Sequence, residues 1–159
     1  SPYFLTLHET VESEIVFSML KSPDRRWFAD GMANAISLLI MQSRNLGKSL
    51  QDLLSIYYPA PKNLIETLDS VDLKSWEAKE NETHEYPKNA YYHLATLAVL
   101  EMIKENGKKF IPELFRELRS QDYETNNIQT VYEIFQKQTG NNMVSYIKKV
   151  EQQVTEKYK

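Results

Sequence analysis

Apolar residues recur at the spacing of amphipathic helices along most of the chain, and no segment shows the strict alternation typical of strands. The first predicted helix covers residues 3–20. Ser22-Pro23-Asp24 ends it, because proline cannot continue a helix there. One side of this helix carries Leu5, His8, Glu12, Ile15, Val16 and Met19. The pattern therefore places an imidazole and a carboxyl group in the same row as the apolar side chains.

The same periodicity, together with glycine, asparagine and proline stop signals, predicts the remaining helices. They cover residues 26–44, 48–58, 63–68 (a short turn), 89–105, 110–119, 128–138 and 143–155. Asn45-Leu46-Gly47 is the predicted end of the second helix. The most polar stretch, residues 77–88, is predicted to be a flexible loop that contains a solvated His84. The pattern as a whole predicts an all-α fold of about eight helices.

Composition narrows the class of protein. A length of 159 residues, with 42% hydrophobic and 26% charged residues, fits a single domain (residues 1–159) that buries a proper core. The net charge of -3 and the lack of a basic stripe give no reason to expect nucleic acid as a partner. The sequence contains no cysteine, which excludes disulfides and thiolate chemistry. No apolar stretch approaches the roughly 20 residues of a membrane span.

Two short motifs carry the candidate chemistry, His8-Glu9-Thr10-Val11-Glu12 and Trp27-Phe28-Ala29-Asp30-Gly31-Met32-Ala33. Seventeen residues separate Glu12 from Asp30. In order and spacing the two motifs resemble the signature of the gluzincin metallopeptidases, which include the thermolysin-like peptidases and a large group of aminopeptidases. In that family a helical His-Glu-x-x-His is followed by a glutamate ligand, often in the context Trp-x-x-Glu-Gly-x-Ala.

The resemblance implies a metal site in which His8, Glu12 and Asp30 are the ligands and Glu9 is the general base. It also implies zinc as the metal and a peptide or protein as the substrate. Two of the ligands depart from the family pattern, because Glu12 stands where a second histidine is usual and Asp30 stands in place of glutamate. The chain is therefore expected to be metallopeptidase-like, with an altered metal site.

A second match lies in Tyr92-His93-Leu94-Ala95, which resembles the Tyr-x-x-Gly of the aminopeptidases with alanine in place of glycine. The resemblance implies that Tyr92 stabilises the oxyanion of the tetrahedral intermediate. Residues 91–119 and 135–146 also resemble the helical tail of these peptidases, so that the likeness spans nearly the whole chain. It implies the helical half of a peptidase domain.

In the resembled family a β-rich part precedes the motif helix and supplies an edge strand for the peptide substrate. This chain has no such part, and Ser1-Pro2 lies only a few residues before the first motif. We therefore expect the sequence to be a fragment of a longer protein.

Helix geometry supports one site. His8 and Glu12 are four residues apart and project from one face of the first helix, with Glu9 beside them. The break at Pro23 lets the second helix fold back and bring Asp30 to the same point. One imidazole and two carboxylates shift metal preference from zinc toward manganese, iron or calcium. Without a cation the three carboxylates would repel one another, and one would hold a proton.

Three functions stay open on the sequence. The first is a peptidase-like metal site that has kept or lost its activity. The second is a non-catalytic helical module that binds a peptide or protein in the same cleft. The third is a structural helical domain in which the short motif arises by chance.

Overall fold

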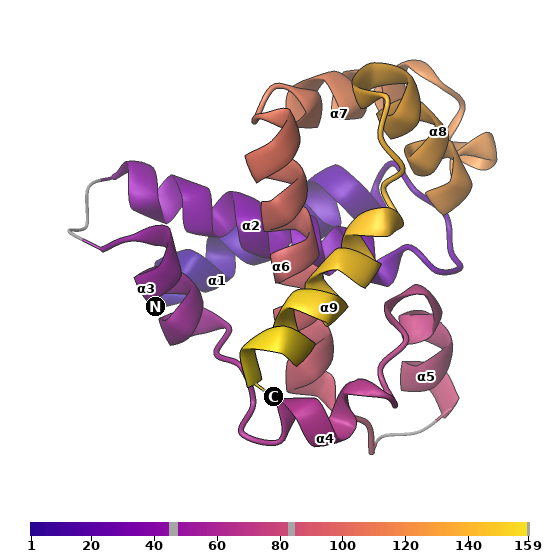
Figure 1. Cartoon of the computed structure of the whole chain (residues 1–159). Helices are drawn as coiled ribbons and strands as arrows, with labels where there is room; N and C mark the ends of the chain where they lie inside the picture. The colour runs from indigo at the N-terminus through magenta and orange to yellow at the C-terminus, as the bar shows by residue number, and fades with distance from the viewer. Residues whose placement is uncertain (45–47, 83–84, 159) are drawn as a thin grey trace.

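A computed structural model describes residues 1–44, 48–82 and 85–158 and confirms the all-α class (Figure 1). Within these ranges the chain forms nine α-helices and no strand: α1 Pro2–Glu9, α2 Arg26–Ser43, α3 Leu50–Tyr57, α4 Leu64–Leu68, α5 Trp76–Glu82, α6 Lys88–Asn106, α7 Phe110–Ser120, α8 Ile128–Thr139 and α9 Ser145–Tyr158. Three other helical segments are η1 Thr10–Phe17, η2 Leu73–Ser75 and η3 Tyr123–Thr125. None of the described helices has the length and apolar character to cross a membrane.

The two longest helices, α2 and α6, cross at the centre of the molecule, and α9 lies along α6 (Figure 1). Their backbones meet at Gly31, where a Cβ atom would lie 2.7 Å from the carbonyl oxygen of Ala95 and 2.9 Å from Cγ2 of Val99. Only glycine permits this approach, because any side chain there would overlap the backbone of α6. Trp27 and Phe28 are fully buried beside the crossing. The residues around Gly31 are thus fixed against α6.

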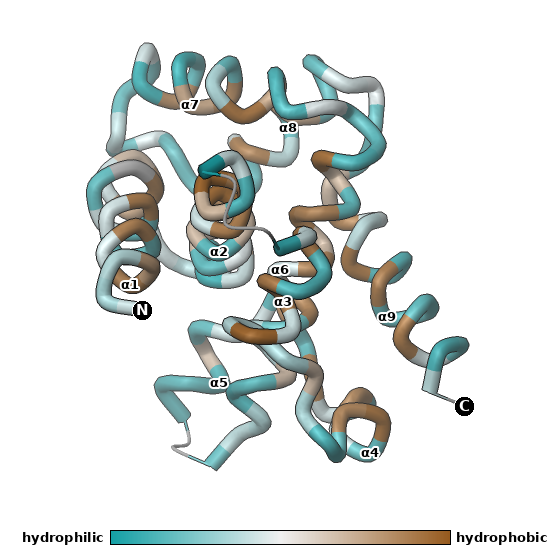
Figure 2. The backbone as a smooth tube through the Cα atoms, turned by 90° about the vertical axis from the view of Figure 1, so that its left-hand side faces the viewer, coloured by the Kyte–Doolittle hydropathy of each residue, from teal (hydrophilic) through white to brown (hydrophobic). Residues whose placement is uncertain are grey.

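Outer helices bury one face each. In α7 the buried residues are Phe110, Leu114, Phe115 and Leu118, spaced so that they share one side of the helix. Figure 2 shows this hydrophobic side turned toward the rest of the molecule, while the outer side is hydrophilic. A smaller cluster of Phe4, Leu38, Met41, Leu53 and Leu54 holds α3 against α1 and α2. That cluster brings the end of α3 close to the first sequence motif.

The predicted first helix, residues 3–20, is not one regular helix. An α-helix over Pro2–Glu9 is followed by a π-helix over Thr10–Phe17, and the helical segment ends before Pro23 as expected. Apolar periodicity does not distinguish the i→i+5 bonds of a π-helix from those of an α-helix, which explains why the change was not predicted. π-Helical segments occur frequently at functional sites. Here the transition falls between Glu9 and Glu12, within the motif.

The predicted loop over residues 77–88 is wrong for its first part, because residues 76–82 form α5. Trp76 is buried at the start of this helix, while Glu77 pairs with Arg25 and Glu80 pairs with Arg26. The stretch is polar because it is a solvated helix attached to α2 by two carboxylates. His84 and the predicted helix end at Asn45-Leu46-Gly47 lie outside the described residues.

The close contact at Gly31 leads to a first prediction. Gly31→Ala should lower the free energy of unfolding by about 2 kcal/mol, because a backbone carbonyl cannot move aside and the clash outweighs the better helix propensity of alanine. Urea denaturation followed by circular dichroism measures the change.

Ser37→Ala in the same helix is a suitable control. Its buried hydroxyl has no hydrogen-bond partner within the described part of the chain, so its removal should leave stability unchanged or slightly higher. Equal stability of Gly31→Ala and the parent would show that α2 and α6 do not approach so closely.

Candidate metal centre

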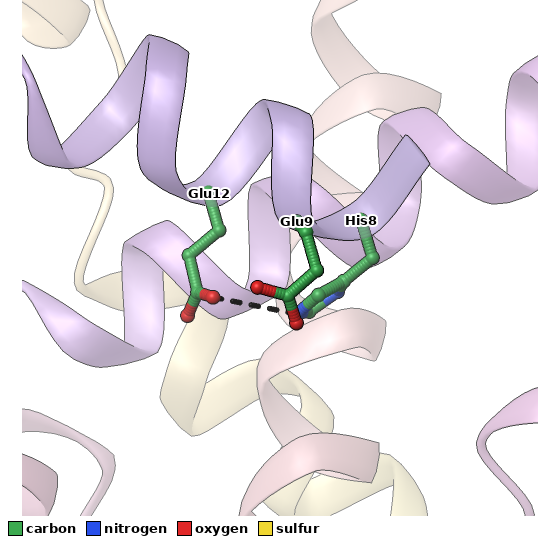
Figure 3. Close-up of side chains that lie close together, drawn as sticks. All are labelled: His8, Glu9 and Glu12. Carbon is green, nitrogen blue, oxygen red and sulfur yellow. Dashed lines mark ion pairs between the residues drawn. The ribbon is translucent and has the colours of Figure 1, made fainter. Parts of the chain in front are cut away.

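Three side chains of the first motif point to the same side of the α1–η1 segment (Figure 3). One donor atom each from His8, Glu9 and Glu12 lies within 4.8 Å of the others. His8 Nε2 is 3.6 Å from Glu12 Oε2, and this pair is only slightly exposed, at 11% and 14% of the side chains. Glu9 is exposed beside them. The motif therefore gathers one imidazole and two carboxylates at the protein surface.

Asp30 reaches the same point from α2. Its Oδ1 atom is 3.9 Å from His8 Nε2, and its side chain is only 1% exposed. Two donor atoms that each bind one ion at about 2.1 Å can be no more than about 4.2 Å apart. The distances from His8 Nε2 to Glu12 and to Asp30 both meet this limit. The structure thus brings the three predicted ligands His8, Glu12 and Asp30 together.

Asn34 sets the tautomer of His8. The Nδ1 atom of His8 lies 2.7 Å from Asn34 Oδ1, an oxygen that can only accept, so Nδ1 carries the proton. Asn34 is held in turn because its amide group donates to the hydroxyl of Thr96 on α6, at 2.9 Å. When the ring is neutral, the lone pair of His8 is therefore on Nε2, which faces the two carboxyls. A second partner of this kind typically orients a histidine that ligates a metal.

Arg26 orients Asp30 in a similar way. The Nε–H group of Arg26 donates to Asp30 Oδ2 at 3.0 Å, one helical turn away on α2. The other oxygen, Oδ1, is buried and has no hydrogen-bond partner among the residues described. A buried carboxylate oxygen without a partner is costly unless a proton or a cation meets it. This unpaired atom is the one that faces His8 Nε2.

Arg26 connects Asp30 to the predicted oxyanion residue. Its Nη2 group donates to the hydroxyl oxygen of Tyr92 at 3.0 Å, and its guanidinium also pairs with Glu80 of α5. The guanidinium carbon lies 4.8 Å from the ring centroid of Trp76, so the cation stacks on an aromatic face. Arg26 is therefore fixed from three sides.

A hollow of about 210 Å³ opens next to these groups. It is lined by Phe4, Leu5, His8, Glu9, Tyr58 and Tyr92. Burial, assisted by the charge of Asp30, raises the pKa of Tyr92 to about 12, so this phenol keeps its proton at neutral pH. Because the oxygen of Tyr92 already accepts from Arg26, its own O–H remains available to donate. The hollow thus combines a predicted ligand, the predicted base and a phenol donor.

The charges of the three ligands depend on one another. Burial favours a neutral ring, but contact with Glu12 and the charge of Asp30 outweigh it and raise the pKa of His8 above its ordinary value. Contact with His8 lowers the pKa of Glu12. Burial, reinforced by the charge of Glu12, raises the pKa of Asp30 to about 7. In the absence of a cation, the proton that one of the carboxyl groups is expected to hold therefore lies on Asp30 rather than on Glu12.

Comparisons of the chain with protein-family models, curated proteins and solved structures found no match. The chemistry of the site therefore rests on the geometry of its own residues.

Arg26 and Asn34 were not among the predicted residues of the metal site. Both lie four residues from Asp30, one before it and one after it, and so share its face of α2. That spacing around a predicted ligand is the signal that could have found them. On the sequence, the Tyr57-Tyr58-Pro59 cluster could line a cleft or cap a core, and only the packing of α3 on α1 places Tyr58 at this site.

The raised pKa values of His8 and Asp30 predict how stability changes with pH. Both groups bind a proton more tightly in the folded state, so their contribution is present at low pH and is lost as pH rises through the folded pKa values. Without divalent cations, we expect Asp30 alone to reduce the free energy of unfolding by about 1 kcal/mol between about pH 6.5 and 8.5. Urea denaturation in the presence of a chelator measures this loss.

Asp30→Asn is the matched variant, because it removes the titrating carboxyl and keeps an oxygen for Arg26. The free energy of unfolding of this variant should fall less over the same pH range than that of the parent. Burial lowers the pKa of His93, so that ring is neutral in both folded and unfolded chains above about pH 7 and adds little to the change. If the parent protein gains stability across this pH range, Asp30 does not hold a proton in the folded state near neutral pH.

Proposed function

We propose that the chain is a metallopeptidase-like helical domain, related to the gluzincins, whose altered ligand set binds a divalent cation beside a peptide-binding cleft. One observation carries the proposal. Asp30 has one oxygen held by Arg26, while the other is buried, unpaired among the described residues and 3.9 Å from His8 Nε2. An oriented carboxylate and an oriented imidazole facing one point are the arrangement that a metal ion needs.

Charge balance supports a cation at this point. Glu9, Glu12 and Asp30 surround His8, and Glu80 lies on the far side of Arg26. The cluster contains four carboxyl groups and one guanidinium, so it carries an excess of negative charge when His8 is neutral. Burial, reinforced by the charge of Glu12, favours a proton on Asp30, and a divalent cation at this point would offset both effects.

The donor set defines the class of cation. One imidazole nitrogen and two carboxylate oxygens suit manganese, iron or calcium better than the nitrogen-rich sites that select zinc. Zinc is the metal implied by the resemblance to gluzincins. Such an ion, once bound, would lower the pKa of a coordinated water and polarise a peptide carbonyl.

Glu9 and Tyr92 give the cleft its catalytic groups in this proposal. The carboxylate of Glu9 is exposed and lines the same hollow as His8, where it can take a proton from a water molecule. The phenol of Tyr92 lies across the hollow and keeps an O–H that can donate to an oxyanion. Arg26 positions Tyr92 and Asp30 relative to each other.

A second function is favoured by one observation. Arg26 already supplies positive charge to Asp30 and Glu80 from within the protein. The site can therefore be held together without a metal, and the cleft beside His8 would then serve a non-catalytic module that binds a peptide or protein. Cation binding distinguishes the two functions.

We expect manganese(II) to bind with a stoichiometry of one in calorimetric titrations at about pH 8, above the pKa of about 7 of Asp30, because metal ligands must be deprotonated. His8→Ala, Glu12→Gln and Asp30→Asn should each weaken binding at least about tenfold. Glu14→Gln is the control, because Glu14 is an exposed carboxylate of the same η1 segment and should have no effect. If manganese does not bind, or binds equally well to all three variants, the metal site is ruled out. The non-catalytic binding module and the structural domain would then be the remaining functions.

We expect Glu9→Gln to abolish any cation-dependent peptide hydrolysis while manganese affinity changes less than about twofold, because the proton acceptor is lost and the ligands remain. Tyr92→Phe should lower kcat by about 10²–10³ with little change in KM, as for other oxyanion donors. Hydrolysis of a fluorogenic peptide measures both. Unchanged turnover in Glu9→Gln would show that Glu9 is not the general base. Peptide binding without turnover in the parent protein would favour the non-catalytic binding module.

A further inference from the structure

A second hollow lies on the other side of Tyr58 from the metal centre. It has a volume of about 220 Å³ and is enclosed by the end of α3, by α6 and by the last turns of α9. Figure 1 shows α9 running along α6 toward the segment that follows α3. Leu54, Leu97 and Val154 form its apolar wall. The hollow shares Tyr58 with the metal centre, but no predicted ligand of the metal lines it.

His93 supplies an unused acceptor in this hollow. Its Nδ1–H group donates to the backbone oxygen of Tyr58 at 2.7 Å, which fixes the tautomer and leaves the lone pair on Nε2. No hydrogen bond to Nε2 is made within the described ranges, although the ring is only 7% exposed. Because the ring lines the hollow, a donor group that enters the hollow can bond to Nε2.

The outer end of the hollow is positively charged. Lys157 lies exposed on the last turn of α9, makes no ion pair with any described residue and is close enough to contribute to the lowered pKa of His93. The side-chain amides of Gln51 and Gln153 also line the hollow and can donate or accept. The lining thus combines an acceptor, an apolar wall and an exposed cation.

We propose that this hollow is a binding pocket for a small organic acid that carries a hydroxyl group at the end opposite its carboxylate. The hydroxyl donates to Nε2 of His93, the apolar body lies against Leu54, Leu97 and Val154, and the carboxylate meets Lys157. The volume equals that of roughly seven water molecules, which is room for one aromatic ring with short substituents. The pocket is a site separate from the metal centre and does not depend on bound metal.

The test uses 4-hydroxyphenylacetate as the probe. We expect it to bind the full chain at one site, with phenylacetate at least about tenfold weaker, because phenylacetate leaves the acceptor of His93 unpaired. The uncharged 4-hydroxyphenylacetamide should bind only a few-fold more weakly than the acid, because Lys157 is exposed and its charge is screened. Calorimetry gives the affinities, and the NMR signal of the His93 ring should shift on binding.

His93→Asn separates the two sides of the ring. An asparagine amide can still donate to the carbonyl of Tyr58, but it has no group at the position of Nε2. This variant should fold, as shown by an unchanged circular dichroism spectrum, and should lose the preference for the hydroxylated acid. Lys157→Met should lower the affinity for 4-hydroxyphenylacetate by a few-fold and leave the affinity for 4-hydroxyphenylacetamide unchanged. Lys148→Met, which removes an exposed charge of the same helix outside the pocket, is the control.

Three results would overturn the proposal. They are no binding of 4-hydroxyphenylacetate at millimolar concentration, equal affinity for 4-hydroxyphenylacetate and phenylacetate, and an unchanged preference for the hydroxyl in a folded His93→Asn protein. Each measurement is made in the presence of a chelator, so that its outcome is independent of whether the metal centre binds a cation.

Discussion

The contact between α2 and α6 at Gly31 is the constraint on which the rest of the structure depends. It places two backbones within touching distance one residue after Asp30. Asn34 and Thr96, one from each helix, can then share a hydrogen bond, and Arg26 can reach Tyr92 across the same interface. The positions of a buried carboxylate, an imidazole partner and a phenol therefore follow from the absence of a single Cβ atom.

Electrostatics then determines what this rigid arrangement can hold. The carboxylate of Asp30 has two oxygens with different environments, since Arg26 holds one and the other is without a partner in the part of the chain described. The guanidinium of Arg26 and a bound metal ion can therefore both contact the carboxylate of Asp30, each through a different oxygen. A site built in this way can be stable without metal and still retain a place for one, which explains why both proposed functions are compatible with one geometry.

Apolar periodicity predicted most of the helices because their buried faces are continuous, as in α7, and because glycine follows the ends of α6 and α8. It failed at α5, where two carboxylates rather than an apolar stripe attach the helix to its neighbours. It also could not predict the π-helix, since the side-chain pattern does not report the hydrogen-bond register.

The candidate site was predicted only in part. The pairing of His8 with Glu12 follows from their spacing on one helical turn. The position of Asp30 depended on a resemblance, because nothing in local periodicity states which residue of the next helix will lie opposite. Arg26, Asn34 and Tyr58 were not among the predicted site residues, because their roles come from tertiary packing, in which each meets a partner more than twenty residues away.

Tyr58 lines both hollows and lies between them. Its hydroxyl lies 3.4 Å from His8 Nδ1, while its backbone oxygen accepts from His93 on the other side. Any occupant that displaces this residue on one side changes the shape of the other. Thermodynamic linkage requires such an effect to be mutual, so two occupants that each displace Tyr58 would alter each other's affinity by the same factor, whereas occupants that leave Tyr58 in place bind independently. A single tyrosine thus gives a domain of this size the means for communication between two sites.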